Sequence, residues 1–148
     1  MAEINNTAEI EMLEFEVGSA KYGIDIGLVT EIMTNVPVTP VPDSRPDIEG
    51  IFIPRDELIT VVDMYRVFGV IRCEGEKKLF IVCHVNDANI AFHVTAVKGL
   101  IMVKRDDILP PGELLEGKKH PELFKGVIKT EHGIILVPDI ESIIRKNS

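Results

Sequence analysis

The residues that could act as nucleophiles are two cysteines and a few serines. Cys83 is directly followed by His84, which puts a thiol next to an imidazole base in the sequence. The apolar residues around them predict a strand, however, and neighbouring residues on a strand point to opposite faces. Ser19, Ser44 and Ser142 lack the flanking glycines of a nucleophile elbow. The sequence therefore offers no nucleophile that is paired with a base.

The histidines and aspartates likewise show no pattern that predicts acid–base catalysis or metal binding. The four histidines, at positions 84, 93, 120 and 132, have no partner three or four residues away that would suit a metal ion. His93 lies in an alternating segment, where a packed or an edge-exposed histidine is expected more than a metal ligand. Nothing places Asp25 and Asp63 together as catalytic carboxylates. We predict a non-enzyme without catalytic residues, metal or cofactor; a small enzyme or ligand-binding barrel is the less favoured alternative.

The composition is that of an ordinary globular protein, with 45% hydrophobic and 27% charged residues in a chain of 148. A formal net charge of −8, without a strong basic patch, opposes binding to nucleic acid or anionic lipid. No segment approaches the roughly 20 apolar residues of a membrane-spanning helix, and no signal peptide is recognisable. We expect a cytoplasmic chain without direct membrane insertion, in which Cys73 and Cys83 are reduced thiols.

Most of the chain has the pattern of short strands. In residues 13–17, apolar side chains alternate with carboxylates, as in a strand with one wet face. A turn at Gly18 then leads into residues 22–26, which predicts a hairpin. The other expected strands are residues 48–53, 58–62, 79–85, 90–94, 97–103, 123–129 and 134–137. The predicted fold class is therefore mainly β.

Three kinds of segment depart from this pattern. Residues 28–33 place their apolar side chains on one side of a helical wheel, which predicts a short helix. The proline-rich residues 36–46 cannot donate a full ladder of backbone hydrogen bonds, so we expect an extended edge or a surface loop. Residues 1–11 are polar and aperiodic and predict a flexible leader, and residues 146–148 should fray.

The sequence also repeats weakly at an offset of 76 residues. When Gly50 is aligned with Gly126, apolar residues coincide without a gap through two strands and a following helical turn. Asp63 then falls on Asp139, at the start of the helical turn in each copy. An aspartate at that position can cap the free N–H groups of the helix, which explains both residues without catalysis.

Upstream of these segments, residues 22–29 overlay residues 90–97. We therefore expect one domain over residues 12–148, built from two related β-barrel subdomains at roughly 20–85 and 86–140, with exchange of the terminal strands left open. Small closed barrels would avoid the exposed edges and the exposed apolar face of a lone open sheet. The junction of the two subdomains predicts a groove.

Several of these segments resemble the CheW-like domain family. Residues 22–26 (YGIDI), followed by residues 29–32 (VTEI), are similar to the family's YGIDI…V.EI opening. Residues 58–69 (LITVVDMYRVFG) resemble its V(I/V)P(V/I)(I/V)DLR..FG motif. The likeness continues through residues 39–42, 48–51, 124–127 and 134–144. It covers nearly the whole chain after residue 12.

The resemblance implies two tandem five-stranded SH3-like barrels with short helices, including a C-terminal one. It implies a non-catalytic adaptor that couples the cytoplasmic tip of methyl-accepting chemoreceptors to the regulatory domain of a chemotaxis histidine kinase. By the same resemblance, Val29, Glu31, Gly50 and Arg55 lie at or near the receptor-binding groove. The kinase-facing residues remain unassigned.

Two positions depart from the family pattern. The family's Asn-Leu-Arg-Gly tetrad stands here as Ile53-Pro54-Arg55-Asp56, so we expect a different turn, because aspartate takes a positive φ less easily than glycine and proline lacks a backbone donor. Thr95 occupies a position where the family usually has an aspartate. These departures leave open an alternative: a divergent CheW-like scaffold in a chemosensory pathway that does not control flagella.

Overall fold

The computed structural model describes residues 8–72, 77–112 and 121–145, and its fold is mainly β, as predicted. The strands are β1 (Glu9–Val17), β2 (Ala20–Asp25), β3 (Val29–Thr34), β4 (Ile48–Phe52), β5 (Ile59–Asp63), β6 (Leu79–Val85), β7 (Ala88–Val94), β8 (Ala96–Lys104), β9 (Ile108–Leu109), β10 (Phe124–Thr130) and β11 (Gly133–Pro138). The helices are η1 (Ile26–Leu28), α1 (Met64–Phe68), η2 (Arg105–Asp107), η4 (Pro121–Leu123) and α2 (Ile140–Arg145). Across these described segments, no helix has the length and apolar character needed to cross a membrane.

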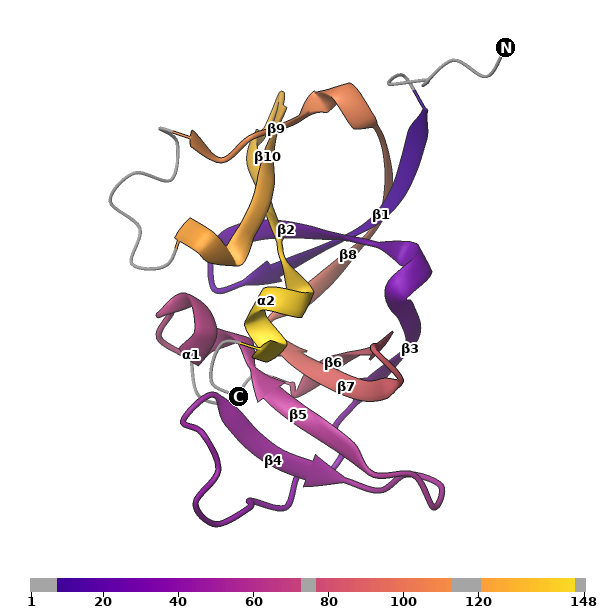
Figure 1. Cartoon of the computed structure of the whole chain (residues 1–148), viewed down its shortest axis with the longest axis vertical. Helices are drawn as coiled ribbons and strands as arrows, with labels where there is room; N and C mark the ends of the chain where they lie inside the picture. Colours follow the sequence, from indigo (N-terminus) through magenta and orange to yellow (C-terminus); the bar gives the residue numbers. More distant parts are fainter. Residues whose placement is uncertain (1–7, 73–76, 113–120, 146–148) are drawn as a thin grey trace.

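The strands form two sheets that are stacked along the long axis of the molecule (Figure 1). One has six strands in the order β8-β1-β2-β11-β10-β9, and the other has five in the order β3-β6-β7-β5-β4. The sixth strand of the larger sheet is the two-residue β9. In each sheet the two edges come together. η2 connects the edge strands β8 and β9, and Thr39, which follows β3, forms a β-bridge to Ile51 of β4.

Each half of the chain contributes its first hairpin to the sheet of the other half. The β1–β2 hairpin pairs antiparallel with β8 and parallel with β11. The β6–β7 hairpin pairs antiparallel with β3 and parallel with β5. The approximate limits 20–85 and 86–140 are therefore not the limits of the sheets, because β2 lies in the six-stranded sheet and β7 in the five-stranded sheet.

The sequence repeat is visible in the strand pairing. Gly50 of β4 faces Val61 of β5, and Gly126 of β10 faces Val137 of β11, at the same offset of 76 residues. Both ladders shift register just before the glycine, as at a β-bulge. The two copies therefore share their pairing as well as their order of elements.

The repeat glycines are required because another backbone segment passes directly over them. A β-carbon at Gly50 would collide with the carbonyl oxygen of Thr39, and one at Gly126 would lie 2.8 Å from the carbonyl oxygen of Leu109. Thr39 and Leu109 occupy equivalent places, because Thr39 pairs with Ile51 and Leu109 pairs with Val127. In each case the partner is the residue that follows the glycine. Only glycine permits this approach, which closes each sheet.

The predicted helix caps are confirmed in both copies. The Asp63 carboxylate accepts a hydrogen bond of 3.0 Å from the backbone N–H of Tyr65 at the start of α1. The Asp139 carboxylate accepts bonds from the backbone N–H and the hydroxyl of Ser142, at 3.3 and 2.9 Å, at the start of α2. Capping accounts for both aspartates.

The largest core lies between the two sheets, and a smaller one lies inside each sheet. At the centre of the large core, the ring of Tyr22 stacks on Phe68 at 4.4 Å between centroids and on Phe15 at 5.6 Å. Phe124 stacks on Phe68 at 5.4 Å. Because this core contains side chains from both halves at close packing, the halves form one body.

The proline-rich segment after β3 is a loop, as predicted, and it holds the C-terminal helix in place. The Arg45 guanidinium forms two hydrogen bonds with the Asp47 carboxylate, at 2.7 and 3.0 Å. It also donates to the backbone carbonyls of Ile143 and Ile144, at 3.2 and 2.6 Å. These last carbonyls of α2 have no partner within the helix, so a charged donor is well suited to them.

Two predictions about local structure are wrong. The helix expected over residues 28–33 is instead η1 followed by β3, in which residues 29–34 alternate between half-buried and exposed. The β-branched Val29, Thr30, Ile32 and Thr34 favour a strand over a helix. The expected leader of residues 1–11 is too long, because β1 begins at Glu9 and pairs with β8 from there. Residues 1–7 and 146–148 lie outside the described residues.

Candidate functional site

Two of the residues to which the family resemblance assigns receptor binding, Glu31 and Arg55, form an exposed ion pair. The Nη2 atom of Arg55 lies 3.2 Å from each carboxylate oxygen of Glu31. Arg55 comes from the turn between β4 and β5, and Glu31 comes from the edge strand β3. The Arg55 side chain is 75% exposed and the Glu31 side chain 37%, so the pair faces solvent. An exposed pair of this kind contributes only about 0–1 kcal/mol to stability.

The other two predicted residues lie deeper. Val29, at the start of β3, is partly buried and packs against the large core between the sheets. Gly50 is buried beneath the Thr39 backbone. The structure therefore brings Glu31 and Arg55 together at the surface, whereas Gly50 can act only by shaping the loop that covers it.

The turn that carries Arg55 keeps a left-handed residue despite its changed sequence. Asp56 has φ of 57°, the conformation that glycine adopts most easily. Aspartate tolerates this conformation better than most residues, because its short polar side chain can bond locally. The substitution of the family's glycine by Asp56 is therefore compatible with a left-handed turn.

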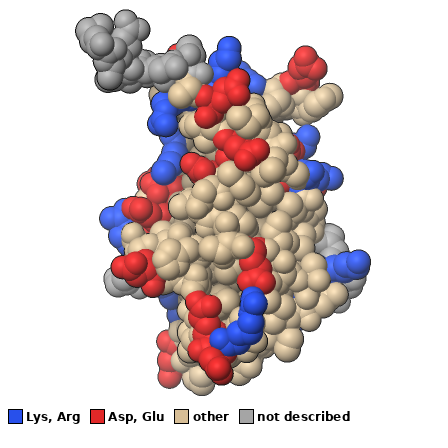
Figure 2. Space-filling model, turned by 90° about the vertical axis from the view of Figure 1, so that its right-hand side faces the viewer, with Lys and Arg blue, Asp and Glu red and all other residues tan. Residues whose placement is uncertain are grey.

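Exposed apolar side chains flank the turn that carries Arg55. Ile53 and Leu58, on either side of the turn, are 60% and 55% exposed, whereas Ile32, which is 44% exposed, points to the opposite face of β3 from Glu31. A shallow hollow of about 520 Å³ beside the turn is lined by residues from the loop after β3 and from the end of β4. Figure 2 shows the side of the molecule that carries β3, β1 and β8, where a broad central area has few charged groups. This surface combines apolar contact area with one oriented pair of charges.

Thr95, the second departure from the family pattern, has a structural role. Its hydroxyl lies 2.6 Å from the Tyr65 hydroxyl and accepts a hydrogen bond of 2.8 Å from the backbone N–H of Gly18. Its backbone N–H donates to the carbonyl of Glu16. Thr95 thus ties the β1–β2 turn to α1, across the junction of the sheets.

A partly buried polar network, which the sequence did not reveal, lies in the five-stranded sheet. Glu49 Oε1 is 2.7 Å from His93 Nδ1 and 3.0 Å from Arg72 Nη2, and Arg72 also pairs with Asp63 at 2.7 Å. The Arg72 guanidinium lies 5.0 Å above the centre of the Tyr65 ring. His93 is 3% exposed, so it is the packed one of the two expected alternatives, packed or edge-exposed.

The network shifts the pKa values of two of its members. Burial raises the pKa of Glu49, but hydrogen bonding and charge from His93 and Arg72 outweigh it, so the pKa lies below its ordinary value of 4.5. Burial lowers the pKa of Arg72, but Asp63 and Glu49 outweigh it, so the net shift is upward. Both shifts favour the charged forms. The network is a partly buried ion cluster whose charged forms stabilise one another.

Cys83, the candidate nucleophile, is not set up to react as a thiolate. Cys83 is a buried free thiol, and burial raises its pKa to about 12, far from the range in which a thiolate forms. His84 is exposed and its Nδ1 lies 3.1 Å from the Asn89 side-chain oxygen. Cys73 and His120 lie outside the described residues. Among those that are described, His, Cys, Asp and Glu side chains form no group of three or more that could hold a metal ion.

Comparison with known proteins shows the family to which the chain belongs. Residues 11–148 match the CheW-like domain family. The chain is 30% identical over 139 residues to the chemotaxis protein CheW of Thermotoga maritima, with coverage of 93% of this chain and 89% of that protein. It is 27% identical over 143 residues to the CheW of Treponema pallidum, covering 93% and 84%.

A solved structure has the same fold. The crystal structure of the scaffolding protein TtCheW from Thermoanaerobacter tengcongensis superimposes with a TM-score of 0.83 at 24% identity, over 95% of each chain. This chain therefore belongs to the CheW-like domain family, the non-catalytic scaffolds of chemotaxis signalling.

Proposed function

We propose that this chain couples the cytoplasmic tip of a chemoreceptor to the regulatory domain of a chemotaxis histidine kinase, and that Glu31 and Arg55 lie on its receptor-binding surface. Membership of the CheW-like family supports the adaptor role. The observation that carries the site is the ion pair between Glu31 and Arg55, 3.2 Å long, at the edge of an exposed apolar surface.

The arrangement suits a helical partner. Helical segments are commonly bound when their apolar side chains enter a hydrophobic depression, and the hollow beside residues 51–54 is such a depression. Apolar burial would supply most of the affinity, whereas charges at the rim mainly set orientation and association rate. In this proposal Gly50 acts indirectly, because it allows the loop that lines the hollow to lie close to β4.

The test is calorimetric titration of the chain with a receptor cytoplasmic fragment and, separately, with a kinase regulatory domain from the same genome. We expect saturable binding to both. The Arg55→Glu variant places two carboxylates together at the rim, so receptor affinity should fall about tenfold or more. Its urea midpoint should stay within error, because the exposed pair contributes little to stability.

Two further variants sharpen the test. Arg66→Glu makes the same charge change at an exposed position on α1, away from the ion pair, and should leave receptor affinity unchanged. The double variant Glu31→Arg with Arg55→Glu restores an opposite-charge pair in reverse and should recover part of the affinity. Unchanged receptor binding by folded Arg55→Glu would remove this residue from the interface, and binding to neither partner would refute the adaptor function.

The non-flagellar alternative rested on two departures from the family pattern, the altered turn at residues 53–56 and Thr95. The left-handed conformation of Asp56 and the pairing of Arg55 with Glu31 support a turn that can still present Arg55 to a receptor. A receptor-coupling role in either type of chemosensory pathway fits the same surface, and the titration above applies to both.

A further inference from the structure

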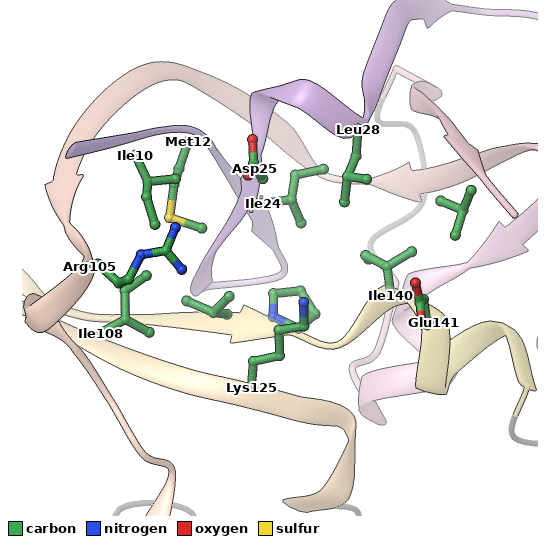
Figure 3. Close-up of a pocket in the computed structure, with 13 residues that line it drawn as sticks. Ile10, Met12, Ile24, Asp25, Leu28, Arg105, Ile108, Lys125, Ile140 and Glu141 are labelled. Atoms are coloured by element: carbon green, nitrogen blue, oxygen red, sulfur yellow. The ribbon is translucent and has the colours of Figure 1, made fainter. Parts of the chain in front are cut away.

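A pocket of about 280 Å³ opens where the six-stranded sheet meets the core between the sheets. Its floor is apolar, and Ile10, Met12 and Ile108, which line it, also belong to the hydrophobic cluster of that sheet. Figure 3 shows Arg105 at one side of the pocket, Glu141 beside Ile140 at the other, and Lys125 between them. Apolar pockets at barrel mouths with a few convergent polar groups are typical small-molecule sites, and this one is near the lower limit of their size.

In the five-stranded sheet, aromatic rings fill the position that corresponds to this pocket. There the rings of Phe80 and His93 lie 4.8 Å apart, and the Tyr65 ring lies 5.6 Å from His93. The two alignments of the repeat pair Phe80, His93 and Tyr65 with Met12, Asp25 and Glu141, in that order. None of these three is aromatic, and all three line the pocket. The pocket therefore exists because the six-stranded sheet lacks the rings that fill the five-stranded sheet.

The charge at the pocket is also opposite in sign to the charge at the equivalent place of the five-stranded sheet. At the five-stranded sheet, Glu49 is paired with a cation of the same chain, Arg72, at 3.0 Å. The residue aligned with Glu49 is Lys125, and Arg105 adds a second cation to the pocket wall. Within the residues that the structure describes, neither Lys125 nor Arg105 forms an ion pair. Whereas the anion Glu49 is paired within the chain, the group that would pair with the cation Lys125 at the six-stranded sheet is an anion from outside the chain.

The two acids of the pocket limit the charge of the ligand. Asp25 already accepts a hydrogen bond of 2.8 Å from the backbone N–H of Gly27, and Glu141 lies across the pocket from Arg105. With two cations and two acids, the wall has no excess positive charge to hold a polyanion such as a nucleotide. A single carboxylate fits the forked donors of Arg105 with the ammonium of Lys125.

We propose that this pocket binds a small monocarboxylate with an apolar body, its carboxylate on Arg105 and Lys125 and its hydrocarbon part against Ile10, Met12 and Ile108. The proposal is independent of receptor or kinase binding. Both cations are on exposed positions, so we expect a weak site with a dissociation constant in the millimolar range.

The test uses amide chemical shifts of the labelled protein during titration with 4-methylpentanoate. Two matched probes separate the contributions: 4-methylpentan-1-ol has the same body without charge, and leucine adds an ammonium group. We expect saturable shifts at the pocket residues with the acid, and binding at least tenfold weaker for the alcohol and for leucine. Arg105→Gln and Lys125→Gln should each weaken the acid about tenfold, as expected for loss of a charged hydrogen bond.

Lys129→Gln is the matched control, because Lys129 is an exposed lysine on the same strand, β10, but does not line the pocket. It should leave the affinity unchanged, and the spectra themselves report whether each variant is folded. Equal binding of the alcohol would reduce the site to an apolar hollow, and tighter binding of leucine would make it a zwitterion site. Either result overturns the proposal, as do absent shifts or shifts that neither substitution weakens.

Discussion

The two halves of this chain share a framework but treat two equivalent places in opposite ways. Around the five-stranded sheet, the turn at residues 54–57 extends Arg55 to Glu31, while the interior position is filled by the rings of Phe80, His93 and Tyr65. In the second half, the turn closes on itself through the Thr130 hydroxyl, which bonds the carbonyl of Gly133 and the N–H of His132. The interior position there is open.

This difference shows which positions the fold requires and which are free to change. The glycines and capping aspartates coincide in both halves because strand closure and helix initiation depend on them. By contrast, Arg55 aligns with Glu131, and Glu31 aligns with Gly99. The duplicated scaffold therefore presents the exposed ion pair on one half only, which gives a symmetric framework a single oriented surface.

The strongest test of the shared framework is to add one methyl group at each repeat glycine. Gly50→Ala and Gly126→Ala should each destabilise the protein by about 1–3 kcal/mol or more, because the new β-carbon meets rigid backbone of Thr39 or Leu109. Urea denaturation gives the free energies of unfolding. If the closure is truly equivalent, the two losses should be similar in size.

Gly27→Ala is the control, since a β-carbon at Gly27 would approach only the side-chain carboxylate of Asp25, at 3.2 Å, and no backbone. It should cost clearly less than either repeat glycine. A large loss at Gly126 with none at Gly50 would mean that the bridge from Thr39 does not close the five-stranded sheet.

The sequence predicted this framework because its signals are local. Alternating and continuous apolar segments predicted nine strands, and the offset of 76 residues identified the glycine and aspartate of each copy. It did not show that the hairpins are exchanged, because exchange depends on pairing between distant segments, which leaves no local pattern. It also predicted a helix over residues 28–33, where β-branched side chains at an edge strand outweighed a helical periodicity too short to be decisive.

The polar network of the first half should make stability depend on pH. The folded-state pKa of Glu49 lies below its ordinary value of 4.5, so the unfolded state takes up its proton first as the pH falls. Its contribution is fully present above about pH 4.5 and is lost as the pH drops through the folded pKa. Glu49→Gln should lower the free energy of unfolding at pH 7 by about 1–2 kcal/mol and flatten its decrease in acid.

Urea midpoints measured from pH 3 to 7 check this prediction. Glu131→Gln removes an exposed carboxylate from the second half and should leave the acid-dependent decrease unchanged. If Glu49→Gln loses stability equally at every pH, the network contributes through packing and hydrogen bonding, without a shifted carboxyl group.

The candidate site was only partly predictable. Glu31 and Arg55 came from the family resemblance, and the structure joins them, but Gly50 proved to be buried. The pocket in the second half was missed, although the alignment of Glu49 with Lys125 carried its signal. A reversed charge at a repeat position becomes informative only when its surroundings are known, and these come from β1, β2, β9 and α2 together.

The smallest expected effect concerns the turn that differs most between the halves. Asp56→Gly relieves a left-handed residue at φ of 57°, but it also gives the unfolded chain more conformational freedom. These terms oppose each other, so the free energy of unfolding should change by less than about 1 kcal/mol. Receptor affinity should be unchanged, since the ion pair of Arg55 remains available.

Asp87→Gly, in the turn between β6 and β7 at φ of 62°, makes the same substitution away from the ion pair and calibrates the backbone effect. Equal stability changes at the two positions would show that Asp56 serves only the turn. A larger loss for Asp56→Gly, accompanied by weaker receptor binding, would mean that the Asp56 side chain itself belongs to the oriented surface that distinguishes the first half from the second.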